Sequence, residues 1–249
     1  MQALNGRIAL VTGASRGLGR AIAERYGGLG ASVIVNYASN ARAAQEVVAT
    51  VESVGSKAIA VKADVGSVAE IRTLFEQARQ AFGRIDIVVA NAGIEVVGVS
   101  ALDFTEEQFD RAFAVNTKGA FFTLQEAGRA VADGGRIIYV GSSTTAFPMP
   151  GHALYGGSKM APRFLVEVMA KELGARRVTV NSILPTTTEG AGVSTGSVRP
   201  AAREFIERYN PMKRMGTVED VADAAEYFAG PLAGFVSGQH LLLSGGGPA

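Results

Sequence analysis

The sequence predicts one α/β domain built on a doubly wound parallel sheet. Short apolar runs alternate with longer amphipathic segments along nearly all of the 249 residues. Several runs are apolar almost throughout, as expected of parallel strands that are covered on both faces. A glycine-rich turn joins the first run to the first amphipathic segment. Right-handed crossovers between successive strands then place the amphipathic segments as helices on both faces of a single sheet.

Each element of this sheet is predicted from one run or from one interval between runs. The predicted strands are the apolar runs at 7–12, 32–36, 57–63, 84–90, 135–141, 178–184 and 240–243. The predicted helices lie at 18–29, 40–54, 68–81, 105–132, 154–174 and 218–229. Ser67–Glu70 and Thr105–Gln108 have the pattern of capping boxes at two helix starts. No linker or internal repeat divides the chain, which favours a single domain over residues 1–249.

Two features interrupt this regular pattern. Pro162 lies inside the helix predicted at 154–174, where its missing N–H is expected to distort the helix. The segment 186–213, rich in threonine and glycine in its first half, shows no periodicity. It follows the sixth predicted strand, and α/β folds bind their ligands at the carboxyl ends of parallel strands. We therefore expect a substrate lid at about 186–213.

The composition excludes several classes of site. The formal net charge is +1, so long-range attraction to nucleic acid or to an anionic membrane is not expected. The chain has no cysteine and two histidines, which excludes disulfides and thiolate ligands and argues against a metal site. No stretch approaches the roughly 20 apolar residues of a membrane span. The sequence predicts a cytoplasmic protein without metal, nucleic acid or membrane partners.

The turn after the first predicted strand has the pattern of a phosphate-binding loop. Gly13, Gly17 and Gly19 let backbone N–H groups approach a ligand closely, because glycine has no Cβ in the way. The helix that follows offers its unpaired N–H groups and the positive end of its dipole to an anion. A strand, a glycine turn and a helix form the first half of a dinucleotide site. An ordinary tight turn is the alternative interpretation.

Two pairs of polar residues are candidates for chemistry at the same sheet edge. Tyr155 and Lys159 stand four residues apart in a predicted helix and so share one face. A nearby ammonium lowers the pKa of a tyrosine, which is usually near 10, so the pair could donate a proton to a carbonyl oxygen. Such pairs also occur without any function. Ser142 and Ser143 follow the predicted strand 135–141, where one hydroxyl could hydrogen-bond a substrate carbonyl.

A serine hydrolase is a weaker interpretation of these residues. The chain has no G-x-S-x-G elbow around Ser142 or Ser143. His152 could serve as a base, but the sequence shows no partner for it, so we expect a loop residue that shapes a pocket. His240, which opens the last predicted strand, is expected to be structural.

Five groups of residues occur in one order and at one spacing along the chain. They are Thr12-Gly13-x-x-x-Gly17-x-Gly19, Asn91-Ala92-Gly93, Asn116, Ser142 and Tyr155-x-x-x-Lys159. In these motifs the chain closely resembles the classical short-chain dehydrogenases/reductases, and within them the carbonyl reductases related to 3-oxoacyl-carrier-protein reductase. The resemblance covers essentially the whole length, including Asp64-Val65 and Ser244-Gly-Gly246. It implies a seven-stranded Rossmann fold, a nicotinamide cofactor and a homotetramer built on the helices 105–132 and 154–174.

The resemblance also implies a role for each of four catalytic residues. Tyr155 would be the general acid in reduction and the general base in oxidation. Lys159 would lower the pKa of Tyr155 and hold the ribose hydroxyls of the nicotinamide half. Ser142, thirteen residues before Tyr155, would orient the substrate carbonyl. Asn116 would hold a water molecule that links Lys159 to solvent.

The cofactor contacts that the resemblance implies are spread over the carboxyl edge of the sheet. They fall on Gly13, Ser15, Arg16, Gly17, Leu18, Gly19, Asn36, Tyr37, Ala38, Ser39, Asp64, Val65, Asn91, Ala92, Gly93, Tyr155, Lys159, Pro185 and Thr188. The chain departs from the family pattern after the sixth strand, where Thr186 follows Pro185 in place of the usual glycine. The threonine that usually touches the cofactor falls on Gly190, which leaves Thr187 or Thr188 as substitutes.

The end of the second predicted strand indicates NADPH. NAD-dependent enzymes of this kind place a carboxylate there to hold the adenine ribose hydroxyls, but residues 35–39 read Val-Asn-Tyr-Ala-Ser. Arg16 lies inside the glycine turn, and its guanidinium can bind a 2′-phosphate in bidentate fashion. Ser39, Asn40 and Arg42 could add donors. The alternative is that Arg16 points into solvent.

These observations predict an NADPH-dependent carbonyl reductase that acts on a small-molecule ketone or, in reverse, on the alcohol. The expected pocket wall is Ser142, Phe147, Met149, His152, Leu154 and Tyr155, together with 94–97 and the lid. Its apolar members suggest an apolar, aromatic ketone.

Two other functions stay open at this point. A 3-oxoacyl-carrier-protein reductase is the first alternative. Asp133 stands where such enzymes tend to have a cation for their acidic partner, although Arg176 matches a second docking position. A non-catalytic NADP-binding sensor is less expected, because such proteins commonly lack one member of the Tyr155/Lys159 pair.

Overall fold

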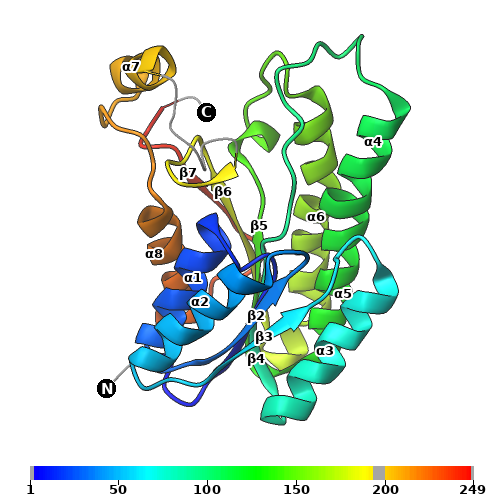
Figure 1. The fold of residues 1–249 in the computed structure, drawn as a ribbon, viewed down its shortest axis with the longest axis vertical. Coiled ribbons are helices and arrows are strands. Elements are labelled where there is room, and N and C mark those ends of the chain that lie inside the picture. Colours follow the sequence, from blue (N-terminus) through cyan, green and yellow to red (C-terminus); the bar gives the residue numbers. More distant parts are fainter. Residues whose placement is uncertain (1–2, 193–199, 248–249) are drawn as a thin grey trace.

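One parallel sheet organises the chain (Figure 1). The computed structural model describes residues 3–192 and 200–247. The strands in these residues are β1 (Ile8–Val11), β2 (Ser32–Tyr37), β3 (Ala58–Lys62), β4 (Ile85–Ala90), β5 (Val131–Val140), β6 (Thr179–Pro185) and β7 (His240–Leu243). All seven pair in parallel, in the order β3-β2-β1-β4-β5-β6-β7. The predicted doubly wound sheet is therefore confirmed. The chain builds β1 to β3 outward from the centre in one direction and β4 to β7 outward in the other.

Helices cover both faces of the sheet (Figure 1). The α-helices in the described residues are α1 (Gly17–Gly28), α2 (Ala41–Ser53), α3 (Val68–Phe82), α4 (Glu106–Ala112), α5 (Ala120–Ala130), α6 (Ala153–Glu172), α7 (Pro200–Tyr209) and α8 (Val218–Ala229). α7 lies beyond the end of the sheet (Figure 1). Side chains of α1, α2 and α8 share one apolar cluster with one face of the sheet. Side chains of α3, α5 and α6 share a second cluster with the other face. The strands are apolar on both sides because both sides are covered.

The largest difference from the predicted elements lies in the helix expected at 105–132. It is divided into α4, a π-helical segment η1 (Phe113–Gly119) and α5. A Cβ on Gly119 would lie 2.6 Å from the carbonyl oxygen of Val65, so the backbone of η1 packs directly on the loop after β3. The wider π-turn thus coincides with a close tertiary contact and with the polar residue Asn116, as π-turns at functional sites commonly do.

The end of this helical region and the lid also differ from prediction. α5 ends at Ala130, and β5 begins at Val131 rather than at 135. The early start of β5 goes with a shift of its register on β4 between Ile85 and Ile87. Within the predicted lid, residues 200–209 form α7, which the sequence analysis did not expect. Residues 193–199 of the lid lie outside the described part of the chain.

One of the two predicted capping boxes is present. At the start of α4, Thr105 accepts the N–H of Gln108, and the Gln108 side chain accepts the N–H of Thr105. At the start of α3, Ser67 accepts the N–H of Glu70, but the Glu70 carboxylate accepts the N–H of Asp64 instead. Only the first of the two hydrogen bonds of a capping box is therefore present at Ser67. The second is missing because the Glu70 carboxylate accepts the backbone N–H of Asp64 in place of that of Ser67.

α6 runs without a break from Ala153 to Glu172 although Pro162 lies inside it. A proline cannot donate to the carbonyl oxygen four residues earlier, which here belongs to Ser158. That carbonyl instead accepts a hydrogen bond from the hydroxyl of Thr117 at 2.8 Å. Thr117 lies in η1, so a side chain of the neighbouring helix replaces the donor that proline lacks. Pro162 therefore does not divide α6.

The replacement donor can be tested by a double-mutant cycle on stability. Thr117→Val keeps the side-chain shape but leaves the Ser158 carbonyl unpaired, which should lower the free energy of unfolding by about 1–3 kcal/mol. In a Pro162→Ala background the same change should cost less, because the backbone N–H restored at position 162 can bond Ser158. Urea unfolding of the four proteins measures the coupling. Equal costs in the two backgrounds would contradict the assigned role of Thr117.

Candidate active site

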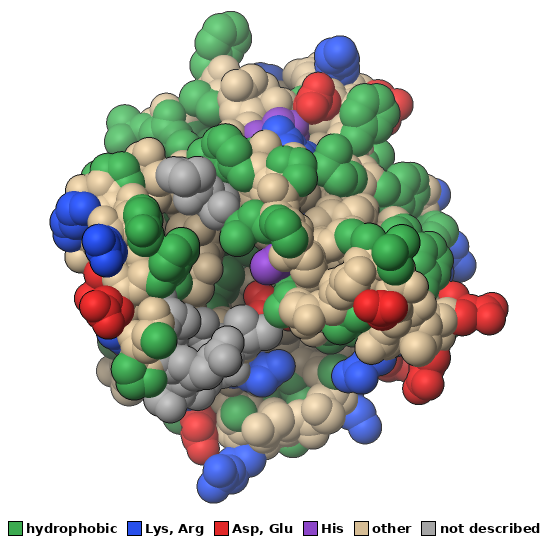
Figure 2. Space-filling view, turned by 90° about the horizontal axis from the view of Figure 1, so that it is seen from above, with side chains coloured by type: hydrophobic (Ala, Val, Ile, Leu, Met, Phe, Trp, Pro, Cys, Tyr) green, Lys and Arg blue, Asp and Glu red, His purple; other side chains and the backbone are tan. Residues whose placement is uncertain are grey.

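The candidate active site lies at the carboxyl edge of the sheet, around the ends of β1, β4 and β5. β2 and β4 flank β1 on opposite sides, and such a switch point opens a crevice for a ligand. Figure 2 looks onto this edge and shows a hollow bordered by hydrophobic side chains near the middle of the face. The sheet thus brings segments that are far apart in the sequence around one hollow.

The glycine turn between β1 and α1 has the geometry of an anion-binding loop. Gly13 and Gly17 have φ angles of +62° and +54°, a region that glycine adopts without strain. A Cβ on Gly13 would lie 2.9 Å from the Cα of Ala92. α1 begins at Gly17 without a side-chain cap from Arg16. Its first-turn N–H groups and the missing Cβ atoms fit the pyrophosphate of a dinucleotide.

Asn36 supports this turn from inside the protein. It is buried, and its Oδ1 accepts the N–H of Gly13 at 3.1 Å. Its Nδ2 donates to the carbonyl oxygens of Val61 and Ala63 at 3.3 and 3.0 Å. The side chain is thus committed to the backbone of the turn and of β3. Asn36 therefore holds the glycine turn in place.

The predicted 2′-phosphate corner lies at the surface. Arg16, Ala38 and Ser39 are exposed, and Tyr37 is half-buried. The side-chain oxygen of Asn40 caps α2 by accepting the N–H of Ala43 at 3.1 Å, and this bond leaves the Nδ2 donors of the same amide unused. The corner presents a guanidinium and a hydroxyl, and residues 36–40 contribute no carboxylate.

Thr12 and Asn91 tie the ends of β1 and β4 together. The Thr12 hydroxyl accepts the N–H groups of Asn91 and Ala92 at 3.0 and 3.1 Å. Asn91 Nδ2 donates to the carbonyl oxygens of Thr12 and Gly13 at 2.9 and 3.2 Å. These bonds fix the glycine turn against the segment that follows β4.

The remaining predicted cofactor residues surround the same edge. Ser15 and Leu18 are half-buried in the glycine turn, and Gly19 is buried. Asp64 is exposed, and its Oδ1 accepts the N–H of Gly66 at 2.8 Å, whereas Val65 is buried. Pro185 ends β6, and Thr188 is buried with its hydroxyl donating to Thr186.

Ser142 and Tyr155 face one another beyond the end of β5. The Ser142 oxygen accepts from the Thr144 hydroxyl at 2.9 Å and from the Thr144 N–H at 3.2 Å. A hydrogen bond from Ser142 to Tyr155 acts to lower the tyrosine pKa. Because Thr144 supplies two donors, the proton of Ser142 is left for Tyr155 or for a substrate oxygen. Ser143 begins the short helix η2 (Ser143–Thr145) and is buried.

Lys159 lies beneath Tyr155 in the core. Its Nζ is 5.9 Å from the centroid of the Tyr155 ring and donates to the carbonyl oxygen of Val140 at 3.2 Å. Burial lowers the pKa of Lys159 to about 8, and the charge of Glu95 opposes this shift. A Cβ on Gly93 would lie 2.9 Å from the Lys159 Nζ, so a side chain at this position would require the ammonium to shift.

Asn116 connects this centre to the segment after β4. Its Oδ1 accepts the N–H of Ile94, and its Nδ2 donates to the Ile94 carbonyl, both at 2.8 Å. Nδ2 also donates to the Ser158 hydroxyl at 3.0 Å. A Cβ on Gly93 would lie 3.2 Å from Asn116 Oδ1. The Asn116 amide and the Lys159 ammonium therefore both lie close to the backbone of Gly93. The predicted catalytic residues therefore lie in one connected group.

The pKa of Tyr155 differs from the sequence-based expectation. Burial raises it above its usual value, and the carboxylate of Glu95 adds to this rise, while the bond from Ser142 opposes it. The Lys159 ammonium, 5.9 Å from the ring centroid, does not offset the burial in this structure. The net shift is upward, where a lowered pKa was expected.

The predicted substrate wall is present in part. Phe147 and Met149 are exposed at the mouth of the site, and His152 is half-buried with Nδ1 3.1 Å from the Pro150 carbonyl oxygen. Leu154 is only 6% exposed, because the first turn of α6 directs it inward. Leu154 therefore packs inside the protein and presents little surface to the mouth of the site.

Sequence reasoning missed two residues of the site. Thr144, which orients Ser142, follows directly after the serine pair and carried no motif signal. Glu95 was treated as part of the 94–97 wall, although a carboxylate between Ile94 and Val96 interrupts an apolar run. That interruption was the signal that could have found it.

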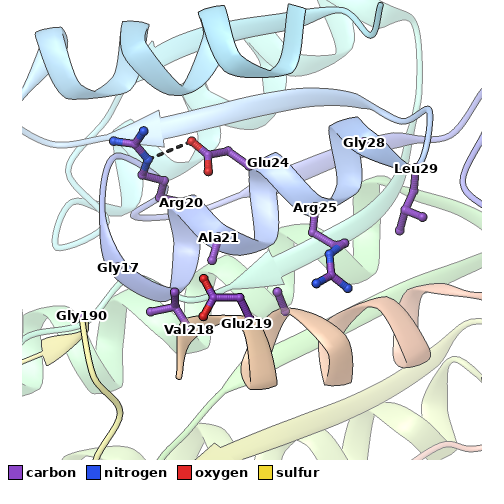
Figure 3. Close-up of a pocket in the computed structure, with 11 residues that line it drawn as sticks. Gly17, Arg20, Ala21, Glu24, Arg25, Gly28, Leu29, Gly190, Val218 and Glu219 are labelled. Carbon is purple, nitrogen blue, oxygen red and sulfur yellow. Dashed lines mark hydrogen bonds and ion pairs between the residues drawn. The ribbon is translucent and has the colours of Figure 1, made fainter. Parts of the chain in front are cut away.

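A second hollow of about 670 Å³ lies between α1 and α8 (Figure 3). Its charged residues include Arg20, which bonds Glu24 at 2.8 Å. Gly17 and Gly190 form one end, and a Cβ on Gly17 would lie 3.5 Å from the Gly190 carbonyl oxygen. The first residues of the predicted lid thus lie beside the glycine turn, at the position where the family pattern has a threonine.

Three further features bear on other kinds of function. His240 contacts the Ser182 hydroxyl through Nδ1 at 2.6 Å and Glu167 through Nε2 at 3.0 Å, so it joins β7 to β6 and α6. In the described residues, no three acidic or histidine side chains are placed to hold a metal ion. None of the helices described is long and apolar enough to cross a membrane.

Known proteins of similar sequence cover the same length of chain. A family model described as enoyl-(acyl carrier protein) reductase matches residues 13–247. A short chain dehydrogenase of Passalora fulva is 39% identical over 98% of this chain and 95% of its own. A trihydroxynaphthalene reductase of Colletotrichum orbiculare is 39% identical over 97% of this chain and 89% of its own.

A solved structure shares the architecture as well. An angucycline C-6 ketoreductase with bound NADP superposes with a TM-score of 0.90 at 39% identity, covering 98% of this chain and 96% of that one. The sheet order, the glycine turn and the Ser142–Tyr155–Lys159 group are thus found in a chain whose whole length matches one family. The protein belongs to the short-chain dehydrogenase/reductase family.

Proposed function

We propose that this protein is an NADPH-dependent ketoreductase that converts a ketone into a secondary alcohol and can run in reverse. The observation that carries the proposal is the meeting of Ser142, Tyr155 and Lys159 beside a glycine turn shaped for a dinucleotide. Two relatives support it by their names, one as a trihydroxynaphthalene reductase and one as a ketoreductase with bound NADP.

The chain's own residues bind the ketone oxygen and deliver a proton to it. The cofactor supplies the hydride when it is bound. As negative charge develops on the oxygen, the hydroxyls of Ser142 and Tyr155, which lie beside one another, stabilise it. Tyr155 then passes its proton to the oxygen. Its raised pKa keeps it protonated until that moment, and Lys159 supplies positive charge beneath the ring.

The proposed cofactor contacts follow from the geometry of the sheet edge. The N–H groups at the start of α1 hold the pyrophosphate, while Arg16 and Ser39 hold the 2′-phosphate at the exposed corner. Asp64 and Val65 flank the adenine, and Lys159 holds the nicotinamide ribose. Asn116 serves the proposed proton relay from Lys159 to solvent.

An apolar, aromatic ketone fits the proposed substrate wall. Phe147 and Met149 present apolar surface at the mouth of the site. A 3-oxoacyl carrier-protein substrate is less favoured, because the Arg176 guanidinium bonds Asp133 at 2.8 Å and the carbonyl oxygens of Gly128 and Val131. The cation expected to dock an acidic partner is thus committed within the protein. A non-catalytic sensor is less favoured because Ser142, Tyr155 and Lys159 are all in place.

The assembly, the lid and the location complete the proposal. Apolar side chains lie on the outer faces of the helices α4, α5 and α6, and Phe164 is 67% exposed. We propose that these helices pair in a homotetramer with two-fold axes. We also propose that 186–213 acts as the substrate lid of the single domain, and that the protein is cytoplasmic.

Removal of the proposed proton donor tests the mechanism. Tyr155→Phe keeps the ring and removes the hydroxyl, so ketone-dependent NADPH oxidation should fall at least ~100-fold. The Kd for NADPH, measured by fluorescence titration, should stay within a few-fold of the wild-type value. Turnover near the wild-type rate would remove Tyr155 from the mechanism.

Cofactor preference tests the 2′-phosphate corner. The wild-type enzyme should prefer NADPH over NADH by at least ~10-fold in kcat/KM, which corresponds to about 1.4 kcal/mol. Arg16→Ala should lower kcat/KM strongly with NADPH and little with NADH. Equal use of both cofactors by the wild-type enzyme, or equal losses in the variant, would show that Arg16 does not bind the phosphate.

The molar mass in solution tests the assembly. Light scattering at micromolar concentration should give the mass of four chains. Phe164→Asp places a charge in the proposed interface and should reduce that mass, whereas the exposed change Glu76→Gln on α3 should not. A monomeric wild-type protein is the result that would refute the tetramer.

A further inference from the structure

A second tyrosine ring lies beside the buried ammonium of Lys159. Tyr139 is on β5, and its side chain is fully buried. The Lys159 Nζ lies 5.5 Å from the centroid of the Tyr139 ring, compared with 5.9 Å from the centroid of the Tyr155 ring. At up to roughly 6 Å, the negative face of an aromatic ring attracts a cation. The ammonium is therefore placed over two rings, of which Tyr155 alone takes part in the proposed proton transfer.

Tyr139 also contacts the backbone of the same lysine. Its hydroxyl donates to the carbonyl oxygen of Lys159 at 3.4 Å. A Cβ on Gly141 would lie 3.3 Å from Cε1 of Tyr139, so the backbone of Gly141 packs against the edge of the ring. Val140, the next residue of β5, accepts a hydrogen bond from the Lys159 Nζ at 3.2 Å. Two consecutive residues of β5 thus hold both the backbone and the ammonium of Lys159.

The protonation of Lys159 is sensitive to such contacts because the side chain is buried. Lys159 is only 3% exposed, and burial lowers its pKa to about 8. Burial disfavours the charged form of a lysine, so the ammonium needs favourable interactions inside the protein. A contact that changes the protonation equilibrium tenfold moves the pKa by one unit. With a pKa close to neutral pH, one such contact determines how much of Lys159 is charged.

The groups that face Lys159 come from four elements. The carboxylate of Glu95, in the segment after β4, raises the pKa of Lys159. The segment η1 presents the neutral amide of Asn116, α6 presents Tyr155, and β5 presents Tyr139. Burial raises the pKa of Tyr139 well above its usual value, so this ring stays neutral. Tyr139 can therefore attract the ammonium without adding a charge of its own to the site.

We infer that Tyr139 is a positioning residue for Lys159, whose ring face holds the ammonium in place and in its charged form beneath Tyr155. The inference rests on the proposed ketoreductase function and concerns the cation, not the proton donor. The ammonium stabilises the negative charge that develops on the ketone oxygen, so reduction should slow when Lys159 loses its proton. The rate should thus fall as the pH rises through the Lys159 pKa, and loss of the ring should move this fall to lower pH.

The pH profile of ketone reduction tests the inference. kcat/KM for a neutral ketone is measured with saturating NADPH between about pH 6 and about pH 10. Tyr139→Phe keeps the ring face, so the pH at which the rate is half-maximal should stay within about 0.3 units of the wild-type value. Tyr139→Leu removes the ring face and should lower that pH by about one unit. An unchanged or higher pH in Tyr139→Leu would contradict the inference.

A second substitution separates the charge distribution of the ring from its packing. Pentafluorophenylalanine at position 139 has nearly the shape of phenylalanine, but its ring face is positive and should repel the ammonium. It should therefore lower the pH of the half-maximal rate at least as far as Tyr139→Leu does. Because it fills the core, this variant also tests the inference if Tyr139→Leu does not fold.

The control variant is Tyr26→Leu. Tyr26 is fully buried like Tyr139, but it belongs to the apolar cluster on the other face of the sheet, where its hydroxyl donates to the Ala225 carbonyl oxygen at 2.9 Å. This change should lower the free energy of unfolding and leave the pH profile unchanged. An equal shift of the profile in Tyr26→Leu would assign the effect to lost packing and overturn the inference.

The remaining outcomes distinguish the inference from the proposed function. If the wild-type enzyme reduces the ketone with a flat profile over this range, titration of Lys159 does not limit the rate, and the inference is wrong while the ketoreductase proposal stands. The same holds if the pentafluorophenylalanine variant keeps the wild-type profile. No ketone-dependent NADPH oxidation by the wild-type enzyme at any pH, with any of a panel of neutral ketones, would contradict the proposed function and the inference together.

Discussion

The active site depends on the hydrogen bonds of one buried amide side chain. Asn116 holds both polar groups of Ile94 and the hydroxyl of Ser158, and so joins the end of β4 to α6. Asn116 is buried in η1, the segment that is wound as a π-helix. Thr117 in the same segment bonds the carbonyl that Pro162 leaves without a donor. The two irregular helical features therefore stabilise one another.

Burial shifts the pKa values of Tyr155 and Lys159 in opposite directions, whereas the charge of Glu95 raises both. Burial keeps the proton on Tyr155 and makes Lys159 easier to deprotonate, with a pKa of about 8. The carboxylate of Glu95 favours the protonated form of both residues, since a proton on either one reduces negative charge or adds positive charge nearby. A single acidic residue thus acts on both the proposed proton donor and the cation beneath it.

The parts of this site that the sequence could predict are those fixed by neighbours along the chain. Runs of apolar residues determine the strands, and the i, i+4 spacing places Tyr155 and Lys159 on one face. The π-turn could not be predicted, because it depends on the packing of Gly119 against Val65 and on bonds from Asn116 to distant segments. The upward shift of the Tyr155 pKa likewise depends on burial, which spacing alone does not reveal. α7 follows an aperiodic segment, and the proline at its first position, Pro200, was the local signal that could have marked its start.

The buried position of Asn36 has a consequence for redesign of the cofactor site. Its side chain bonds the Gly13 N–H on one side and two carbonyl oxygens of the β3 region on the other. Asn36→Asp would replace the donor by an anion facing those carbonyl oxygens, so it would weaken the turn that every dinucleotide must use. A carboxylate meant to hold a ribose diol therefore belongs on the exposed corner, at Ala38 or Ser39, where it leaves the support of the turn intact. Asn36, which supports the loop, is buried. Ala38 and Ser39, where a substitution could change which cofactor binds, are exposed, although they follow Asn36 closely in the sequence.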